Sequence, residues 1–152
     1  MRLRRLAASA AILLLGPGLS SCGGNEDEDY CAVLKDEDKT LTSLSKQSST
    51  PGADVLNPTE ASMRRLRDAA PAEIRDEWQT VLNAWEAVVD TVAEAGVDAE
   101  DYRPGKTPPG LTPAEREKLS GVAIALTSQR VLDAARGIQD HAQQVCTIDL
   151  TL

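Results

Sequence analysis

The chain has 152 residues and a formal net charge of −8, from 24 acidic and 16 basic side chains. This length suits one domain, and the acidic balance argues against a nucleic-acid-binding protein, which needs a basic surface for phosphate contacts. Phe is absent and aromatic residues make up 3% of the chain, so the core must consist largely of Ala, Val, Leu and Ile, which favours closely packed helices.

The N-terminal segment has the organisation of a secretory signal peptide. Three arginines at positions 2, 4 and 5 precede the apolar run 6–15, and Gly, Pro and small residues follow. The apolar segment is roughly 14 residues long, whereas a membrane-spanning helix needs about 20. We therefore expect a cleaved signal rather than a permanent span.

The end of this segment, Leu19-Ser20-Ser21-Cys22, resembles the lipobox of bacterial lipoproteins, in which an aliphatic and two small residues precede a cysteine. The resemblance implies that the Cys22 thiol receives a diacylglyceryl group, that residues 1–21 are removed, and that Cys22 becomes the first mature residue. A cysteine placed there by chance is the alternative. Because a diacylglyceryl group supplies at least two acyl chains, attachment would be stable. The expected location is the extracytoplasmic face of the cell membrane.

Removal of residues 1–21 takes away three arginines and no acid, which changes the net charge from −8 to −11. This charge also argues against a domain that lies flat on anionic lipid. Residues 22–29, CGGNEDED, end in four consecutive acids and are expected to form a solvated, lipid-anchored tether. The domain itself would span residues 30–152.

The first helix is expected over about residues 29–47, where Tyr30, Leu41 and Leu44 recur at roughly helical spacing. The Ser-Ser-Thr-Pro-Gly cluster at 48–52 marks its end as a loop.

A short second helix is expected from Pro58 to Ala70. Asn57 would be its N-cap, Pro58 suits the first helical position, and Glu60 would complete a capping box.

A long third helix is expected between Pro71 and Gly96, where Gly ends the last turn. Its apolar residues recur in steps of four and three and form one face. They are Ile74, Trp78, Val81, Trp85, Val88, Val92 and Ala95.

The final helix is expected from Thr112, which with Glu115 forms a second capping-box pattern, to about Cys146, with a bend at Ser120-Gly121. Its apolar face is expected to hold Ile124, Ser128, Val131, Ala135, Ile138, Ala142 and Val145, and to be widened by Leu119, Val122, Leu126 and Leu132. Four helices, one of them short, predict an all-α, small up-down bundle.

The two other cysteines lie at the ends of this bundle, Cys31 in the first helix and Cys146 in the last. If Cys22 is lipidated, an even pair remains outside the cytoplasm, where disulfides persist. We therefore predict a Cys31–Cys146 disulfide, with two free buried thiols as the alternative. Such a bond favours four crossings, the short helix included, because an even number brings the chain's ends together; a long return by a loop is the alternative.

The segment 96–111 contains three prolines and is longer than a minimal connector, which favours a functional loop. Tyr102 and Arg103 are expected to be an exposed aromatic and cation within it, and are the first choice for a partner contact; an ordinary surface loop is the alternative.

The chain offers little for catalysis or metal binding. His141 is the single histidine, has no nucleophile at a recognisable spacing, and is expected to be half-exposed on its helix. A calcium loop beginning at Asp36 is excluded because Leu41 and Gln47 stand where Gly and Glu are required. Haem on Met63 and His141 is disfavoured. We therefore expect no enzyme activity, no metal site and no cofactor beyond the covalent lipid.

Both ends of the chain resemble small helical lipoproteins of high-GC Gram-positive bacteria, in the Arg-rich start, Asp29-Tyr30-Cys31 and the closing Cys146-Thr147. The resemblance to that group implies no particular activity. The predicted function is a membrane-anchored binding module whose partner is an unknown envelope protein or ligand. The alternative is a small-ligand carrier with a pocket between helices near Trp78 and Trp85.

Overall fold

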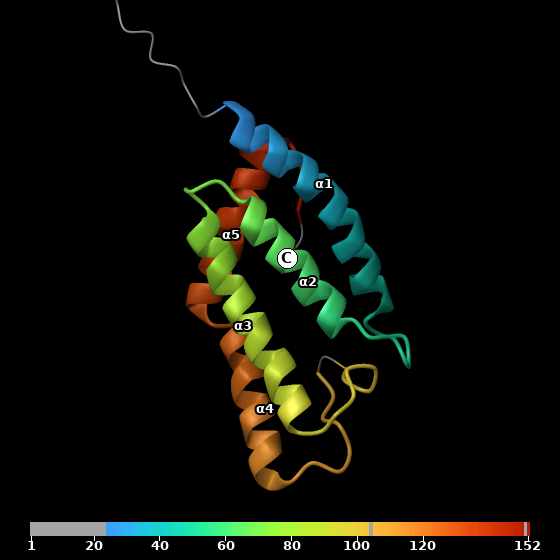
Figure 1. Ribbon diagram of the computed structural model, residues 1–152. Coiled ribbons are helices and arrows are strands. Elements are labelled where there is room, and N and C mark those ends of the chain that lie inside the picture. The colour runs from blue at the N-terminus through green and yellow to red at the C-terminus, as the bar shows by residue number, and fades with distance from the viewer. Residues whose placement is uncertain (1–23, 104, 151) are drawn as a thin grey trace, which may run out of the picture.

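The computed structural model describes residues 24–103, 105–150 and 152, and consists there of five α-helices and a terminal π-helical turn (Figure 1). The elements are α1 (Gly24–Gln47), α2 (Leu56–Ala69), α3 (Arg75–Glu94), α4 (Pro113–Leu126), α5 (Gln129–His141) and η1 (Ala142–Cys146). None of these helices is both long and apolar enough to cross a membrane. The predicted signal peptide and Cys22 lie outside the described residues.

The helices run up and down as a small bundle. α1 packs on α2, α2 packs on α3, and α3 packs on both α4 and α5, which follow one another along it (Figure 1). Five helices therefore make four crossings, and η1 closes the bundle by packing against α1. The prediction of an all-α up-down bundle is confirmed, with its last crossing divided in two.

The division of the last crossing lies at Thr127 and Ser128, not at the expected Ser120-Gly121. The backbone N–H groups of Thr127 and Ser128 donate to carbonyls three residues back, and the Thr127 hydroxyl also donates to the Ile124 carbonyl at 3.0 Å. Hydroxyl side chains compete with the helical hydrogen bonds in this way, whereas a mid-helix Gly costs only about 1 kcal/mol and stays helical.

This break also changes which residues point inward. Leu119 of α4 is buried, with Val122 and Leu126 packed beside it, whereas Ile124 is 67% exposed. The expectation that Ile124 and Val145 continue one inward face was wrong, because the phase of the helix is interrupted between them. Within α5, Val131 and Ile138 do face the core as expected.

The apolar face expected for the third helix is confirmed. Ile74, Trp78, Val81, Val88 and Val92 are buried, and Trp85 packs beside them. The α-helix begins at Arg75 rather than at Pro71, since the residues between form a turn, and Gly96 follows its end with a φ of +66°. The left-handed region favours Gly and ends the helix there.

The two expected capping boxes have different outcomes. Thr112 and Glu115 form the box at the start of α4, with the side chain of each accepting from the backbone N–H of the other. At α2, however, the helix begins before Asn57, and Asp54 Oδ1 accepts from the N–H groups of Leu56 and Asn57 at 3.0 and 3.2 Å. Asp54 precedes the helix start and so reaches its free N–H groups.

The tether expected at residues 22–29 is wrong for most of its length, because α1 begins at Gly24. Glu26 and Asp27 lie in the first turn of the helix. Acidic side chains there are stabilised by the partial positive charge of the helix N-terminus, so the acid run that suggested a solvated chain instead begins the helix.

A partly buried ion pair joins the first two helices. Glu37 of α1 is 9% exposed; it accepts from Ser62 Oγ at 2.5 Å and from Arg65 of α2 at 2.5 and 2.9 Å. The hydrogen bonds from Arg65 are the main cause that lowers the pKa of the Glu37 carboxyl. The charged form of Glu37 therefore contributes to the α1–α2 contact.

Glu37→Gln is expected to lower the free energy of unfolding by about 1–2 kcal/mol at pH 7, because the variant loses the charge-assisted hydrogen bonds from the half-exposed Arg65. Because folding lowers the pKa of Glu37, its contribution is present above the pKa of the unfolded chain and is lost as pH falls through the folded value. Urea unfolding at pH 7 and pH 3 should therefore show the difference between wild type and variant shrinking in acid. Asp36→Asn, at the exposed Asp36–Lys39 pair, is the matched control and should change stability little. An equal difference at both pH values would contradict the assignment.

Candidate functional site

The start of α1, the turn at 70–74 and η1 lie together at one end of the bundle, which we call the disulfide end (Figure 1). Cys31 in α1 bonds to Cys146 in η1 with a Cα–Cα distance of 5.3 Å across 115 residues of sequence. The predicted pairing is confirmed. Loops 48–55 and 95–112 lie at the opposite end, which we call the loop end.

The last turn before the disulfide is π-helical. The N–H groups of Thr147 and Ile148 both donate to the Ala142 carbonyl, and Thr147 has a φ of 56°. Single π-helical turns occur mostly within or at the ends of α-helices, often at functional sites. Here the wide turn ends the last helix at Cys146, against α1.

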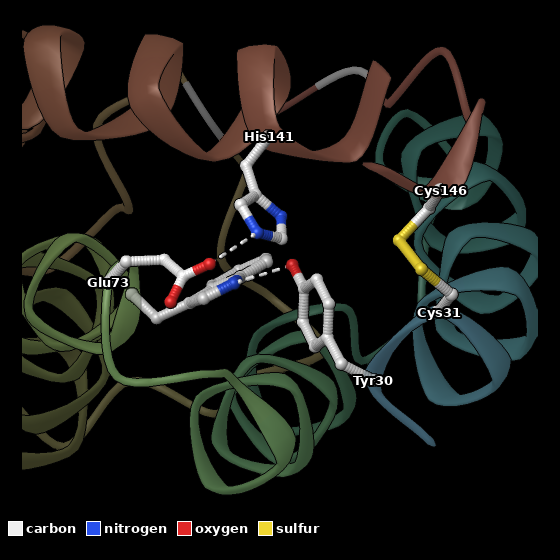
Figure 2. Close-up of a disulfide and its surroundings, with 6 residues drawn as sticks. Tyr30, Cys31, Glu73, His141 and Cys146 are labelled. Carbon is white, nitrogen blue, oxygen red and sulfur yellow. Dashed lines mark hydrogen bonds and ion pairs between the residues drawn. A yellow bond between two sulfur atoms is a disulfide. The ribbon is translucent and has the colours of Figure 1, made fainter. Parts of the chain in front are cut away.

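Beside the disulfide, three buried aromatic side chains with polar atoms contact one another and so connect three helices. Trp78 Nε1 of α3 donates to Tyr30 Oη of α1 at 2.9 Å, and both residues are fully buried. The Tyr30 ring meets the His141 ring of α5 edge to face, with centroids 5.7 Å apart (Figure 2). Burial raises the pKa of Tyr30 to about 12, so this hydroxyl stays neutral.

His141 is not half-exposed as expected, because its side chain is only 9% exposed. Its Nε2 points toward Glu73 of the turn before α3 and lies 3.5 Å from Glu73 Oε1 (Figure 2). Neither imidazole nitrogen has a hydrogen-bond partner among the residues that the structure describes. A buried donor and acceptor without partners are unfavourable, so this side chain needs an explanation.

Asp27 of α1 completes the cluster. One ligand atom from each of Asp27, Glu73 and His141 lies within 4.8 Å of the other two. Asp27 is half-buried and the Glu73 side chain is 63% exposed. An imidazole and two carboxylates at this separation offer a nitrogen and oxygen ligand set for a cation, or acceptors for a protonated histidine.

The cluster was not predicted from the sequence, since its members lie 46 and 68 residues apart and form no motif. Asp27 lies one helical turn before Cys31, and His141 lies five residues before Cys146. These spacings place both residues near the predicted disulfide, but they do not show that the two side chains meet, so no signal in the sequence identified the cluster.

The partner-contact residues expected in loop 96–111 have a different role in the structure. Tyr102 is 7% exposed and packs in a second core with Leu56, Val88 and Leu111, so the expectation of an exposed aromatic was wrong. Arg103 is partly exposed, and its Nη1 donates to the Tyr102 carbonyl at 2.6 Å. A contact through Arg103 remains a prediction.

Tyr102 and Leu111 of this loop are buried because of how the helices are arranged. Within the described residues, α1 and α4 are not packed against each other. Tyr102 and Leu111 contribute apolar area to a core formed with the start of α2, the end of α3 and α4. The loop therefore fills the side of the bundle that a closed four-helix arrangement would cover with α1.

The two tryptophans do not line a ligand pocket. Trp78 is fully buried with its N–H bonded to Tyr30, and the N–H of the half-buried Trp85 donates to the Leu56 carbonyl at 3.1 Å. One surface hollow lies beside Val92 and Val97 and is open to solvent. The arrangement thus gives no support to a carrier that holds its ligand between the tryptophans.

Comparison of the chain with protein-family models, with curated proteins and with solved structures found no match.

Proposed function

We propose that the chain is a lipid-anchored, extracytoplasmic protein that acts as a non-catalytic binding module of the cell envelope. The observation that carries the proposal is the sequence Leu19-Ser20-Ser21-Cys22 behind a signal-like segment. The Cys31–Cys146 disulfide agrees with it, since structural disulfides persist outside the cytoplasm.

The start of α1 sets how such an anchor would hold the domain. Only Gly23 separates Cys22 from the first helical residue, Gly24. Two residues span at most about 7 Å, so the disulfide end would lie directly at the membrane surface. Anionic headgroups repel the net negative charge of the mature domain, and this favours an upright bundle, held at its anchored end, over one that lies on its side.

An upright bundle presents the loop end to the envelope. The outer surface of α4 also faces solvent, and its last turn, nearer the middle of the bundle, holds Ile124, which is 67% exposed between the exposed Ala123 and Ala125. Exposed apolar residues that gather on one helix are typical of protein contacts. We infer that the binding surface includes this part of α4 and that its partner is another protein of the envelope.

Cys22→Ala is expected to abolish lipid labelling and signal cleavage, because the thiol that receives the diacylglyceryl group is absent. The measurement is incorporation of a fatty-acid analogue in the native host, with mass spectrometry of the mature N-terminus and protease access on whole cells. Cys31→Ser, which leaves the lipobox intact, is the matched control and should keep its label.

A wild-type protein that carries no lipid, or whose mature chain does not begin at Cys22, would refute the anchor. The proposed binding surface is tested in the same cells with a photo-crosslinking residue at position 124. The control carries the same residue at Ala32, an exposed position near the disulfide end. A single protein adduct formed from position 124 alone is expected, and no adduct there would count against the proposed surface.

A further inference from the structure

Three separate elements bring one nitrogen and two carboxylates together at the disulfide end. Asp27 comes from the first turn of α1, Glu73 from the turn before α3 and His141 from the end of α5. Their ligand atoms lie within 4.8 Å of one another, and His141 Nε2 lies 3.5 Å from Glu73 Oε1 (Figure 2). We propose that these residues bind a divalent transition-metal cation such as Zn²⁺, which is the ion used in the test below.

The burial of His141 is the independent observation that points to a ligand. Its side chain is 91% buried, yet neither ring nitrogen has a hydrogen-bond partner in the described part of the chain. Nε2 is directed toward the Glu73 carboxylate (Figure 2), and a ligand atom of Asp27 lies within 4.8 Å of a ring nitrogen and of that carboxylate. Exposed acids are common without a cation, but a buried imidazole beside two of them lacks a partner that a metal ion would supply.

The distances suit a small cation. Zn²⁺ bonds to histidine nitrogen and carboxylate oxygen at about 2.0–2.2 Å with tetrahedral geometry, which places neighbouring ligand atoms roughly 3.3–3.6 Å apart. The His141–Glu73 pair already has this separation. Asp27 is half-exposed and Glu73 is 63% exposed, so both carboxylates have room to rotate and close the remaining gap around a bound ion.

The ligand types select the class of metal. A neutral imidazole with carboxylates suits Zn²⁺ and its transition-metal neighbours, whereas Ca²⁺ and Mg²⁺ prefer an all-oxygen set. Two carboxylates balance the charge of the ion, and three protein ligands leave one tetrahedral position for water or a further ligand. Bound metal would tie α1 to the turn before α3 and to α5, next to the disulfide that ties α1 to η1.

The test uses Zn²⁺ alone with the purified full chain, free of any affinity tag that binds metal. Calorimetry should show one equivalent of Zn²⁺ bound. At about a hundredfold excess over the dissociation constant, the melting temperature should rise by on the order of 10 °C. Ca²⁺ and Mg²⁺ at the same concentration should give no comparable shift.

Asp27→Asn and Glu73→Gln should each weaken Zn²⁺ binding at least about tenfold, since loss of even an outer-shell partner of a metal ligand costs about 10–100-fold in affinity. Glu28→Gln and Asp29→Asn are the matched controls, since both acids are exposed in the same turns of α1, and should bind as wild type does. His141→Leu should abolish binding. If His141→Leu does not fold, the two carboxylate variants still decide the question, because their side chains lie at the surface.

Absence of a Zn²⁺-dependent melting shift would overturn the proposal. So would Zn²⁺ binding that Asp27→Asn and Glu73→Gln leave unchanged. If instead these variants alter only the pH dependence of metal-free unfolding, the carboxylates pair with a protonated His141 and the site is not a metal site.

Discussion

Removing the Cys31–Cys146 disulfide is expected to lower the free energy of unfolding by about 4–5 kcal/mol, since the bond closes a loop of 115 residues in the unfolded chain. A domain of this size has a total stability of about 5–15 kcal/mol, so the melting temperature should fall by on the order of 15 °C. Thermal and urea unfolding of Cys31→Ser against wild type measure the change.

The matched variants of this experiment are Cys146→Ser and the double replacement. Because a single bond is lost in every case, the three variants should be destabilised about equally, and adding a reductant to wild type should reproduce the change. A melting temperature that is the same before and after reduction would show that the bond does not stabilise the fold.

Trp78→Ala is expected to destabilise the domain by about 3–5 kcal/mol, the usual cost of a large cavity in a packed core. Trp78 is fully buried in the main core and donates to Tyr30 Oη, so the change also leaves a buried hydroxyl without its donor. Urea unfolding of the variant measures the loss, in oxidised protein so that the disulfide is retained.

Trp85→Ala is the control for this prediction. Trp85 is half-buried and its N–H donates to a backbone carbonyl, so the variant should lose less stability than Trp78→Ala. Equal losses for the two variants, or a Trp78→Ala protein as stable as wild type, would contradict the central role of Trp78 in the core.

Features that depend on neighbouring residues were predictable from the sequence. The capping box of Thr112 and Glu115 formed as expected, and α3 buries the face that its apolar spacing predicted. The disulfide was also predictable, because it followed from the even pair of cysteines that remains beside Cys22 and from the compartment expected for the chain, rather than from any distance. In each case the relevant physics lies within one helix turn or in the chemistry of the residue itself.

Features that depend on how helices compete or fit together were not predictable in this way. Asp54 and Asn57 are both good cap residues, and the position at which α2 meets its neighbours decides between them. The composition of loop 96–111 is that of a surface segment. Tyr102 is nevertheless buried, because α1 and α4 are not packed together and leave apolar area that the loop covers.

The sequence by itself determined that this protein is an acidic, all-α domain with a lipobox-like segment before it and a bond between its first and last helices. Tertiary structure alone decided that Tyr102 is buried, and that Asp27, Glu73 and His141 meet beside that bond. The reason is physical: helical period and capping act over about four residues. Three side chains from three elements converge only when the packing angles between those helices are set.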